Sequence, residues 1–269
     1  METFRRYLLL IYFLFFILNN AFAQVSSALK FDGSNDYVQF SQHLLPVAGD
    51  FTIETWLYLN NSGTKQTIIS QGVPGDAFYI SISNSGALSV GDDWLVTGVN
   101  IPFQQWLHLA IVRSGTQGKI YVNGILANST SAFSPSAGGA FTKFGVQTDS
   151  TSEFANVYLD ELRIWSIERL ADQIQSANQC QFNSSLTSLT ANYHFDNGVP
   201  DGNNNTPLVN TITSQIGGPS INGILNGFDL TGTNSNFVSF TSGASGNPCS
   251  LFYMDNDGDL YGNTANSVW

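Results

Sequence analysis

Apolar and polar residues alternate along most of this chain, in short runs separated by turn-forming residues. Such a period of two places successive side chains on opposite faces of a β-strand. The clearest runs are 51–59, 106–113, 119–123 and 158–166. Strands spaced every 8–12 residues or so, with turn signals between them, predict a β-sandwich or barrel. Weaker strands are predicted at 25–31, 36–40, 66–70, 77–83, 87–90, 141–146, 189–195, 225–230 and 237–240.

Only one segment has helical spacing. Ile167, Leu170, Ile174 and Ala177 recur at the intervals that place apolar residues on one side of a helix. Ser166, immediately before them, can accept a hydrogen bond from the amides of a first helical turn. We therefore expect a single short helix over residues 167–177, directly after the last strand of the domain.

Residues 158–166 carry charges inside an otherwise apolar strand, in a chain of which only 11% is charged. Strict alternation places Asp160 on one face and both Glu161 and Arg163 on the other. A buried charge must be paired, hydrogen-bonded or bound to a metal. The stretch therefore indicates either a strand fixed by structural charge pairing, with Glu161 and Arg163 as partners, or one that offers Asp160 to a cation.

The N-terminus has the pattern of a secretory signal peptide. Arg5 and Arg6 precede an apolar run over 7–18, and Ala21 and Ala23 flank Phe22 as in an A-x-A cleavage site. A transmembrane anchor is the alternative, but the run is too short to span a bilayer. The predicted organisation is a signal peptide at 1–23, a β-domain at 24–178, an extension at 179–249 and an acidic tail at 250–269.

The cysteine content and the charge agree with export. An oxidising compartment permits a disulfide, and the two cysteines allow only the pairing Cys180–Cys249, with two free thiols as the alternative. The net charge is −11. This acidic balance argues against nucleic acid as a partner and against anionic membrane surfaces, and it suits hard cations such as calcium.

Four motifs, in order, carry a family resemblance: LKFDGSNDYVQF, FTIETWLYL, WLHLAIVRSGTQGKIYVNG, and YLDELRIWS followed by ERLADQI. Together they resemble the laminin-G-like branch of the concanavalin A-like lectin/glucanase superfamily. The resemblance implies an all-β fold, a two-sheet antiparallel jelly-roll sandwich. It also implies an extracellular recognition or adhesion module, often with a structural calcium ion. Residues 189–249 look like an extension that follows such domains in large bacterial surface proteins.

The acidic tail offers one candidate metal site. FYMDNDGDLYG resembles the first half of a thrombospondin type 3 calcium repeat, and Asp255, Asp257 and Asp259 alternate as calcium-loop ligands do. The segment departs from the EF-hand pattern because glycine and leucine fall at the wrong positions and no glutamate closes the loop. A solvated acidic tail is the alternative.

The second candidate metal ligand is Asp160. In jelly rolls of the family that this chain resembles, a calcium ion often joins the first strand region to the last strand. Asp160 would supply a side-chain oxygen, and Asp32, Asp36 or main-chain carbonyls near residues 49–50 would complete the site. The alternative is that Asp160 caps backbone amides or pairs with a basic side chain.

Catalysis is opposed by the arrangement of the carboxylates. The glucanases of the wider superfamily carry glutamate and aspartate at alternate positions of one strand, and retaining glycosidases need carboxyl groups about 5–5.5 Å apart. Here Asp160 and Glu161 are adjacent, so simple alternation points them to opposite faces, and Asp92 and Asp93 have the same defect. His108, between two leucines, is expected to be structural. We therefore expect no enzyme activity.

Sugar recognition needs exposed aromatic rings beside hydrogen-bonding groups. Trp94 follows Asp92 and Asp93 in a predicted loop, so these three residues are the candidate ligand-binding set, with packing of Trp94 on the sandwich rim as the alternative. The strand tryptophans are expected in the core: Trp56, Trp106 and Trp165.

The sequence thus predicts a secreted or cell-surface, non-catalytic binding or adhesion module that is stabilised by calcium and binds an extracellular glycan or protein. The alternatives are a glycoside hydrolase of the same fold and a structural spacer in a larger surface protein. After signal removal, no membrane insertion is expected.

Overall fold

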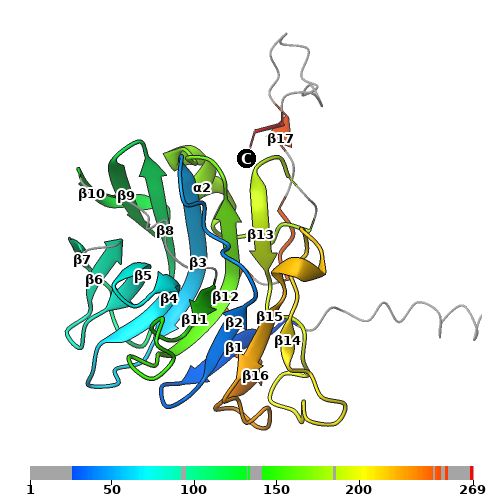
Figure 1. Ribbon diagram of the computed structural model, residues 1–269. Helices are drawn as coiled ribbons and strands as arrows, with labels where there is room; N and C mark the ends of the chain where they lie inside the picture. Colours follow the sequence, from blue (N-terminus) through cyan, green and yellow to red (C-terminus); the bar gives the residue numbers. More distant parts are fainter. Residues whose placement is uncertain are drawn as a thin grey trace, which may run out of the picture.

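The computed structural model describes residues 26–91, 95–131, 133, 141–183, 186–244 and 246–249, and two short strands near the C-terminus. Two antiparallel sheets of eight strands each pack face to face (Figure 1), which confirms the predicted jelly-roll sandwich. Sheet A has the order β10-β9-β8-β3-β12-β1-β16, and β13 also pairs with β12. Its strands are β1 (Ala28–Asp32), β3 (Phe51–Leu59), β8 (Trp106–Ser114), β9 (Gln117–Val122), β10 (Ile125–Thr130), β12 (Asn156–Trp165), β13 (Leu189–Tyr193) and β16 (Asn236–Val238).

Sheet B has the order β14-β15-β2-β11-β4-β5-β6-β7. Its strands are β2 (Tyr37–Phe40), β4 (Gln66–Val73), β5 (Asp76–Ile82), β6 (Ala87–Gly91), β7 (Leu95–Asn100), β11 (Thr142–Phe144), β14 (Thr211–Ile212) and β15 (Gly223–Asn226). A 3-10 turn at Pro219–Ile221 precedes β15, and β17 (Phe252–Tyr253) pairs with β18 (Ser267–Val268) apart from both sheets.

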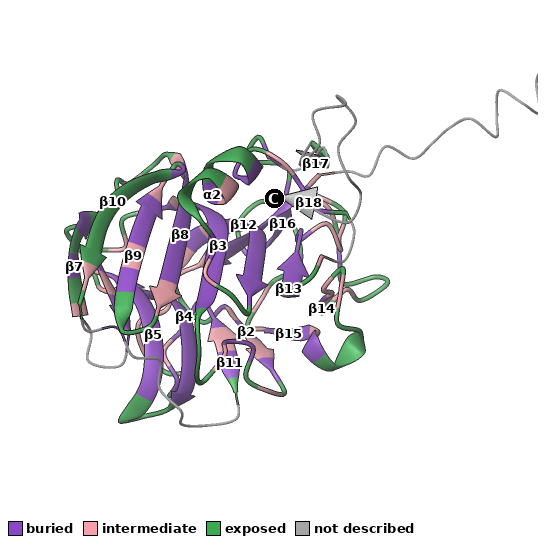
Figure 2. Cartoon of the chain, turned by 90° about the horizontal axis from the view of Figure 1, so that it is seen from above, coloured by how far each residue is buried: buried purple, intermediate pink, exposed green. Residues whose placement is uncertain are grey.

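The core lies between the sheets and is built by the alternation that the sequence indicates. On β3, Phe51, Ile53 and Leu57 are buried in this core. The other face of β3, with Glu54, Trp56 and Tyr58, points away from sheet B. Figure 2 shows how much of the central strands is buried, while β10 at the sheet edge is exposed. The inward residues therefore fix the fold, and the outward residues of sheet A are available for other roles.

The predicted helix is shorter than expected. Helix α2 spans Ala171–Ala177, with Leu170 at the N-cap position, where its amide donates to Gln173 Oε1 at 2.9 Å, so the prediction that the helix begins after Ser166 is wrong. Residues 167–169 instead run beside β3, where the Arg169 amide donates to Thr52 Oγ1 at 2.9 Å. This contact competes with helix formation in the first predicted turn. Ile174 packs α2 onto outward side chains of β8 and β9, so the helix covers part of the outer face of sheet A.

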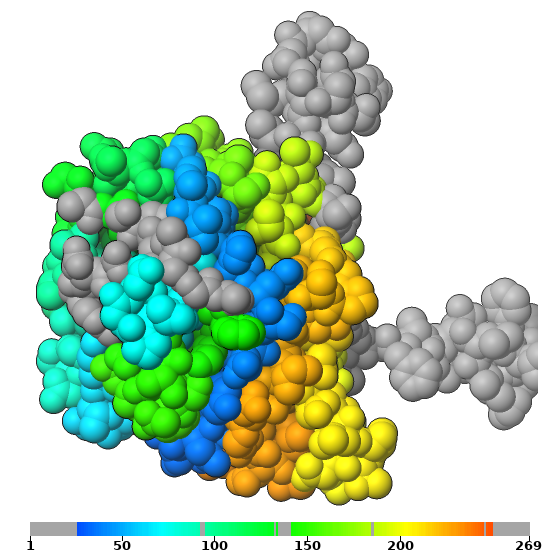
Figure 3. Space-filling view, viewed as in Figure 1, coloured from blue at the N-terminus to red at the C-terminus, as the bar shows by residue number. Residues whose placement is uncertain are grey.

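The C-terminal extension continues both sheets. Strands β13 and β16 lie in sheet A, and β14 and β15 lie in sheet B. Each sheet therefore contains strands from both sides of the predicted boundary at residue 178. Tyr193, Leu225 and Phe237 of the extension belong to the same core as the preceding strands. In Figure 3, the orange and yellow surface of the extension lies directly against the blue surface of the first strands.

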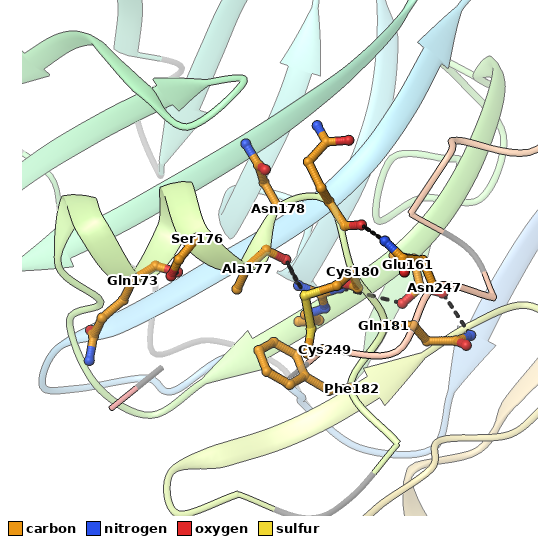
Figure 4. The surroundings of a disulfide bond; sticks show 12 residues. Glu161, Gln173, Ser176, Ala177, Asn178, Cys180, Gln181, Phe182, Asn247 and Cys249 are labelled. Carbon is orange, nitrogen blue, oxygen red and sulfur yellow. Dashed lines mark hydrogen bonds and ion pairs between the residues drawn. A yellow bond between two sulfur atoms is a disulfide. The ribbon is translucent and has the colours of Figure 1, made fainter. Parts of the chain in front are cut away.

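The predicted disulfide between Cys180 and Cys249 is confirmed. It lies next to a short parallel bridge, in which the Gln181 amide donates to the Asn247 carbonyl at 2.6 Å and the Cys249 amide donates to the Gln181 carbonyl at 2.9 Å. Figure 4 shows these residues beside the end of α2. The disulfide therefore ties the last segment of the extension to the chain that leaves the helix.

Candidate ligand-binding face

A β-bulge in β12 changes which side chains share the outer face of sheet A. Asp160 pairs with Trp56 of β3, whereas Arg163 pairs with Glu54, so β12 carries one extra residue between these pairs. Glu161 absorbs the irregularity with a φ of 49°. Directly paired residues project from the same face, and Trp56 and Glu54 both point outward. Asp160 and Arg163 therefore lie on the outer side, and Glu161 lies there too because its carboxylate is 3.5 Å from Arg163 Nη2. The prediction of opposite faces is wrong because a bulge resets the alternation.

Glu54 is the centre of a fully buried ion-pair cluster on this face. Arg169 Nη1 donates to Glu54 Oε1 at 2.6 Å, and His108 Nε2 and Arg163 Nη1 lie 3.5 and 3.9 Å from Oε2. Burial alone would raise the pKa of Glu54, but Arg169, His108 and Arg163 together hold it at about 2. The carboxylate is thus ionised, and it is paired with cationic side chains, as a buried charge must be.

Glu161 belongs to a second buried group, drawn in part in Figure 4. His194 Nδ1 lies 2.9 Å from Oε2, and the Gln181 side-chain amide donates to Oε1 at 2.9 Å. Arg163 Nη2 lies 3.5 Å from Oε2, which confirms the predicted pairing of Glu161 with Arg163. Arg163 also donates to the Ala177 carbonyl at 2.9 Å, so these charges fix the chain between α2 and the disulfide.

Asp160 differs from both glutamates because it lacks a cationic partner among the described residues. It is fully buried, its Oδ2 accepts the Ser242 amide at 2.9 Å, and its Oδ1 has no hydrogen-bond partner. Burial, together with the neighbouring Glu161, raises the pKa of Asp160 well above its usual value. A carboxyl in this environment favours the protonated form unless a cation joins it.

The predicted partners of Asp160 lie elsewhere along the strands. Leu159 pairs with Leu29, whereas Asp32 pairs with Asn156, so Asp32 stands several residues from Asp160 along the sheet. Within the described parts of the chain, no three His, Cys, Asp or Glu side chains converge as metal ligands. The register therefore does not bring Asp160 and Asp32 together, and calcium at Asp160 stays a prediction.

Asp36 is buried at the turn between β1 and β2. It accepts hydrogen bonds from the Asp32 amide at 2.9 Å and from Ser235 Oγ at 2.8 Å, the latter from the extension. Burial raises the pKa of Asp36 to about 7. The two hydrogen bonds lower this pKa, and the negative charges of Asp32 and Asp229 raise it further. Like Asp160, it joins the jelly roll to the extension through an uncharged donor.

Several predicted site residues lie outside the described part of the chain. They are the signal peptide at 1–23, the loop candidates Asp92, Asp93 and Trp94, and the tail residues Asp255, Asp257 and Asp259. The proposed roles of these residues therefore stay predictions.

Three aromatic side chains form a row across the outer face of sheet A. Tyr58 pairs with Trp106 on one neighbouring strand and with Tyr158 on the other, so all three project from the same side. Their ring centroids are 5.9 and 5.4 Å from that of Tyr58. Phe240 of the extension packs on all three at 4.9–5.6 Å and remains 45% exposed. We call these four residues the aromatic face.

The aromatic face was missed in the sequence because alternation alone does not say which face of a strand is the core. Trp106 was expected in the core, but it is half-buried on the outside, so that expectation is wrong. Its neighbour in sequence, Leu107, takes the inward position. Trp56 and Trp165 are buried, but on the outer side of the sheet, under the chain that follows β12.

Polar groups border the aromatic face. Lys30 Nζ lies 4.7 Å from the centroid of the Tyr158 ring and donates to the side chain of Asn156, which also accepts from Asn60 at 2.9 Å. The pKa of Tyr158 is raised mainly by burial, then by Tyr58 and by the nearby carboxylate of Asp201. An apolar aromatic surface with a few convergent polar groups is the composition typical of a small-molecule or sugar site.

The sequence matches the family described as the concanavalin A-like lectin/glucanases superfamily over residues 32–175. This match spans more than half of the chain, which therefore belongs to this family. No curated protein matches the sequence. Among the described helices, none is long and apolar enough to cross a membrane.

Solved structures resemble this chain at low sequence identity. One is a protein from Bacteroides ovatus with a provisional assignment as carbohydrate-binding, with 20% identity and a TM-score of 0.57 over 76% of this chain. The alignment spans 58% of that protein's length. Another is the heptameric SAP-like pentraxin of Limulus polyphemus, with 17% identity and a TM-score of 0.47, covering 58% of this chain and 83% of the pentraxin.

Proposed function

We propose that this chain is a non-catalytic carbohydrate-binding module that acts outside the cell, and that its aromatic face holds the sugar. The observation that carries the proposal is the row formed by Trp106, Tyr58 and Tyr158, with Phe240 exposed above it. Aromatic rings offer flat apolar surfaces that fit the C–H faces of sugar rings, while the half-buried amides of Asn60 and Asn156 at the border can bond hydroxyl groups. The family and the carbohydrate-binding assignment of the Bacteroides ovatus protein support the same reading.

The absence of catalysis is part of the proposal. Although the bulge places Asp160 and Glu161 on one side of the strand, both carboxyls and Glu54 are at most 1% exposed. Glu161 and Glu54 are engaged with histidine and arginine side chains. A glycosidase acid and nucleophile must reach the sugar and a water molecule. These carboxyls therefore suit a structural role, and the alternative of a glycoside hydrolase is tested by assaying the same glycans for cleavage.

Secretion and calcium binding belong to the same proposal. The disulfide suits an oxidising compartment, which agrees with the expected signal peptide. For calcium, the support is the unpartnered Oδ1 of Asp160, because a buried carboxylate oxygen without a donor is suited to a cation. Calcium takes six to eight oxygens, so the site would draw the others from main-chain carbonyls and water.

A glycan array tests the function most broadly. We expect the full chain to bind a subset of immobilised glycans, and Trp106→Ala and Phe240→Ala each to lose that binding. Val73→Ala, an exposed apolar residue on β4, is the matched control and should bind as wild type. Phe240→Ala also removes the ring contacts with Tyr58, Trp106 and Tyr158, so a cooperative thermal unfolding transition must show that the variant is folded. Absence of binding to every glycan would favour the spacer alternative.

A further inference from the structure

A separate cavity opens on the outer face of sheet B, on the opposite side of the sandwich from the aromatic face. It has a volume of about 290 Å³. It lies where β15 of the extension pairs with β2, beside the start of β11. The residues that line it are Gln39, Phe40, Ser41, Phe141, Ile224 and Asn226.

The strand register explains why these side chains surround a hollow. Ile224 pairs with Gln39, so both project outward from adjacent strands. The alternate positions, Leu225 and Val38, pair with each other and point into the core. Phe141, just before β11, closes the other side. Two of the six lining residues, Ile224 and Asn226, come from the extension, and the hollow exists only because β15 adds a strand beside β2.

The walls are apolar and open to solvent. Phe141 is 43% exposed and Ile224 is 47% exposed, although both sit in a concave site where burial would be favourable. Leaving such side chains uncovered has a cost of about 25 cal/mol per Å² of apolar surface, which a ligand that covers them would recover. The Phe141 ring and the Ile224 side chain thus offer apolar surfaces on either side of β2 to a flat ligand.

The polar groups of the cavity define the class of ligand. Gln39 and Asn226 bring side-chain amides, one N–H of Asn226 already donating to the Ile224 carbonyl at 2.9 Å, and Ser41 brings a hydroxyl group. Amides offer both donors and acceptors, as hydroxyl-rich ligands require. No charged side chain is among the lining residues, so the site favours a neutral ligand. Its volume lies at the lower end of ligand pockets, which start at about 300 Å³, so it fits one ring rather than a chain.

We propose that this cavity is a second binding site, which takes a single neutral sugar ring stacked on Phe141 and bonded by Gln39 and Asn226. The site rests on its own residues and does not depend on the aromatic face. Since the two sites lie on opposite faces of the sandwich, one molecule can hold two carbohydrate ligands at once and bridge them.

Saturation-transfer difference NMR on the full chain tests this proposal. The probes are glucose, galactose, mannose, xylose, arabinose and N-acetylglucosamine, each added alone. We expect at least one sugar to receive saturation. Phe141→Ala should weaken its binding by about tenfold, in line with the loss of one aromatic contact. Phe141→Tyr should restore most of the affinity, and Gln39→Ala should reduce it.

The double variant Trp106→Ala/Phe240→Ala separates this site from the aromatic face. If the cavity is a site, this variant retains the sugar signal that Phe141→Ala weakens. If none of the six sugars gives a signal that depends on Phe141, or if the signal disappears with the aromatic face alone, the proposal is wrong. Loss of array binding in Trp106→Ala with the Phe141-dependent signal intact would support both sites independently.

Discussion

Two groups of buried carboxyls differ in what accompanies them. Glu54 lies among Arg169, Arg163 and His108, and its pKa is held at about 2. Asp160 and Asp36 are as deeply buried, but their hydrogen bonds come from Ser242 and Ser235 of the extension and not from a cation. Burial raises the pKa of both. The first group is therefore a charged clamp inside the jelly roll, whereas the second joins the jelly roll to the extension and favours protons or a metal ion.

The largest effect on stability is expected when Arg169, the main cation beside Glu54, is removed. Arg169→Met leaves Glu54 buried with its main partner gone, so the free energy of unfolding at pH 7 should fall by about 3–5 kcal/mol. Urea denaturation measures it. The double variant Arg169→Met/Glu54→Gln is the control and should regain part of the loss, because no charge is left unpaired. A loss below about 1 kcal/mol for the single variant would mean that the clamp is not stabilising.

Calcium would supply the cation that Asp160 lacks. We expect calcium to raise the thermal midpoint of the full chain. At a calcium concentration a hundredfold above the dissociation constant, the free energy of unfolding should rise by about 2.7 kcal/mol. EDTA should reverse the effect, and Asp160→Asn should abolish it. Magnesium at the same concentration is the ion control, since its small octahedral shell suits the site poorly. A midpoint that does not respond to calcium or EDTA would contradict calcium stabilisation.

Asp36 makes the stability of the folded chain depend on pH. Its pKa in the fold is about 7, against 3.8 for the unperturbed side chain. Between these values the folded chain holds more protons than the unfolded chain, so stability falls as the pH rises through this window. Asp36→Asn leaves only one of the two acceptor oxygens, but it removes the titration, so the variant should lose about 1–2 kcal/mol less stability than wild type between pH 4 and pH 8. The same pH dependence in both proteins would refute the raised pKa.

The sequence predicted the fold better than the site. Alternation located β3, β8 and β12 closely, because most of their inward residues are apolar, Thr55 of β3 being an exception. Strand β10 was missed since all of its residues but Thr130 are exposed and lack an apolar face, and its stability comes from pairing with β9. The Cys180–Cys249 disulfide followed from the count of cysteines alone.

The site could not be predicted because it depends on geometry that alternation does not contain. One extra residue at Glu161 moved Asp160 to the outer side of β12. The aromatic face needs Phe240, which is distant in sequence and arrives only through the extension. Likewise, the cavity on sheet B needs the pairing of β15 with β2. Long-range pairing therefore creates both candidate binding sites.

The central claim is that the aromatic face binds carbohydrate. Isothermal titration of the full chain with the best glycan from the array is the most direct test. Wild type and Val73→Ala should bind with equal affinity, and Trp106→Ala should lose at least about tenfold in affinity while keeping its cooperative unfolding transition. Unchanged affinity in both Trp106→Ala and Phe240→Ala would contradict the claim.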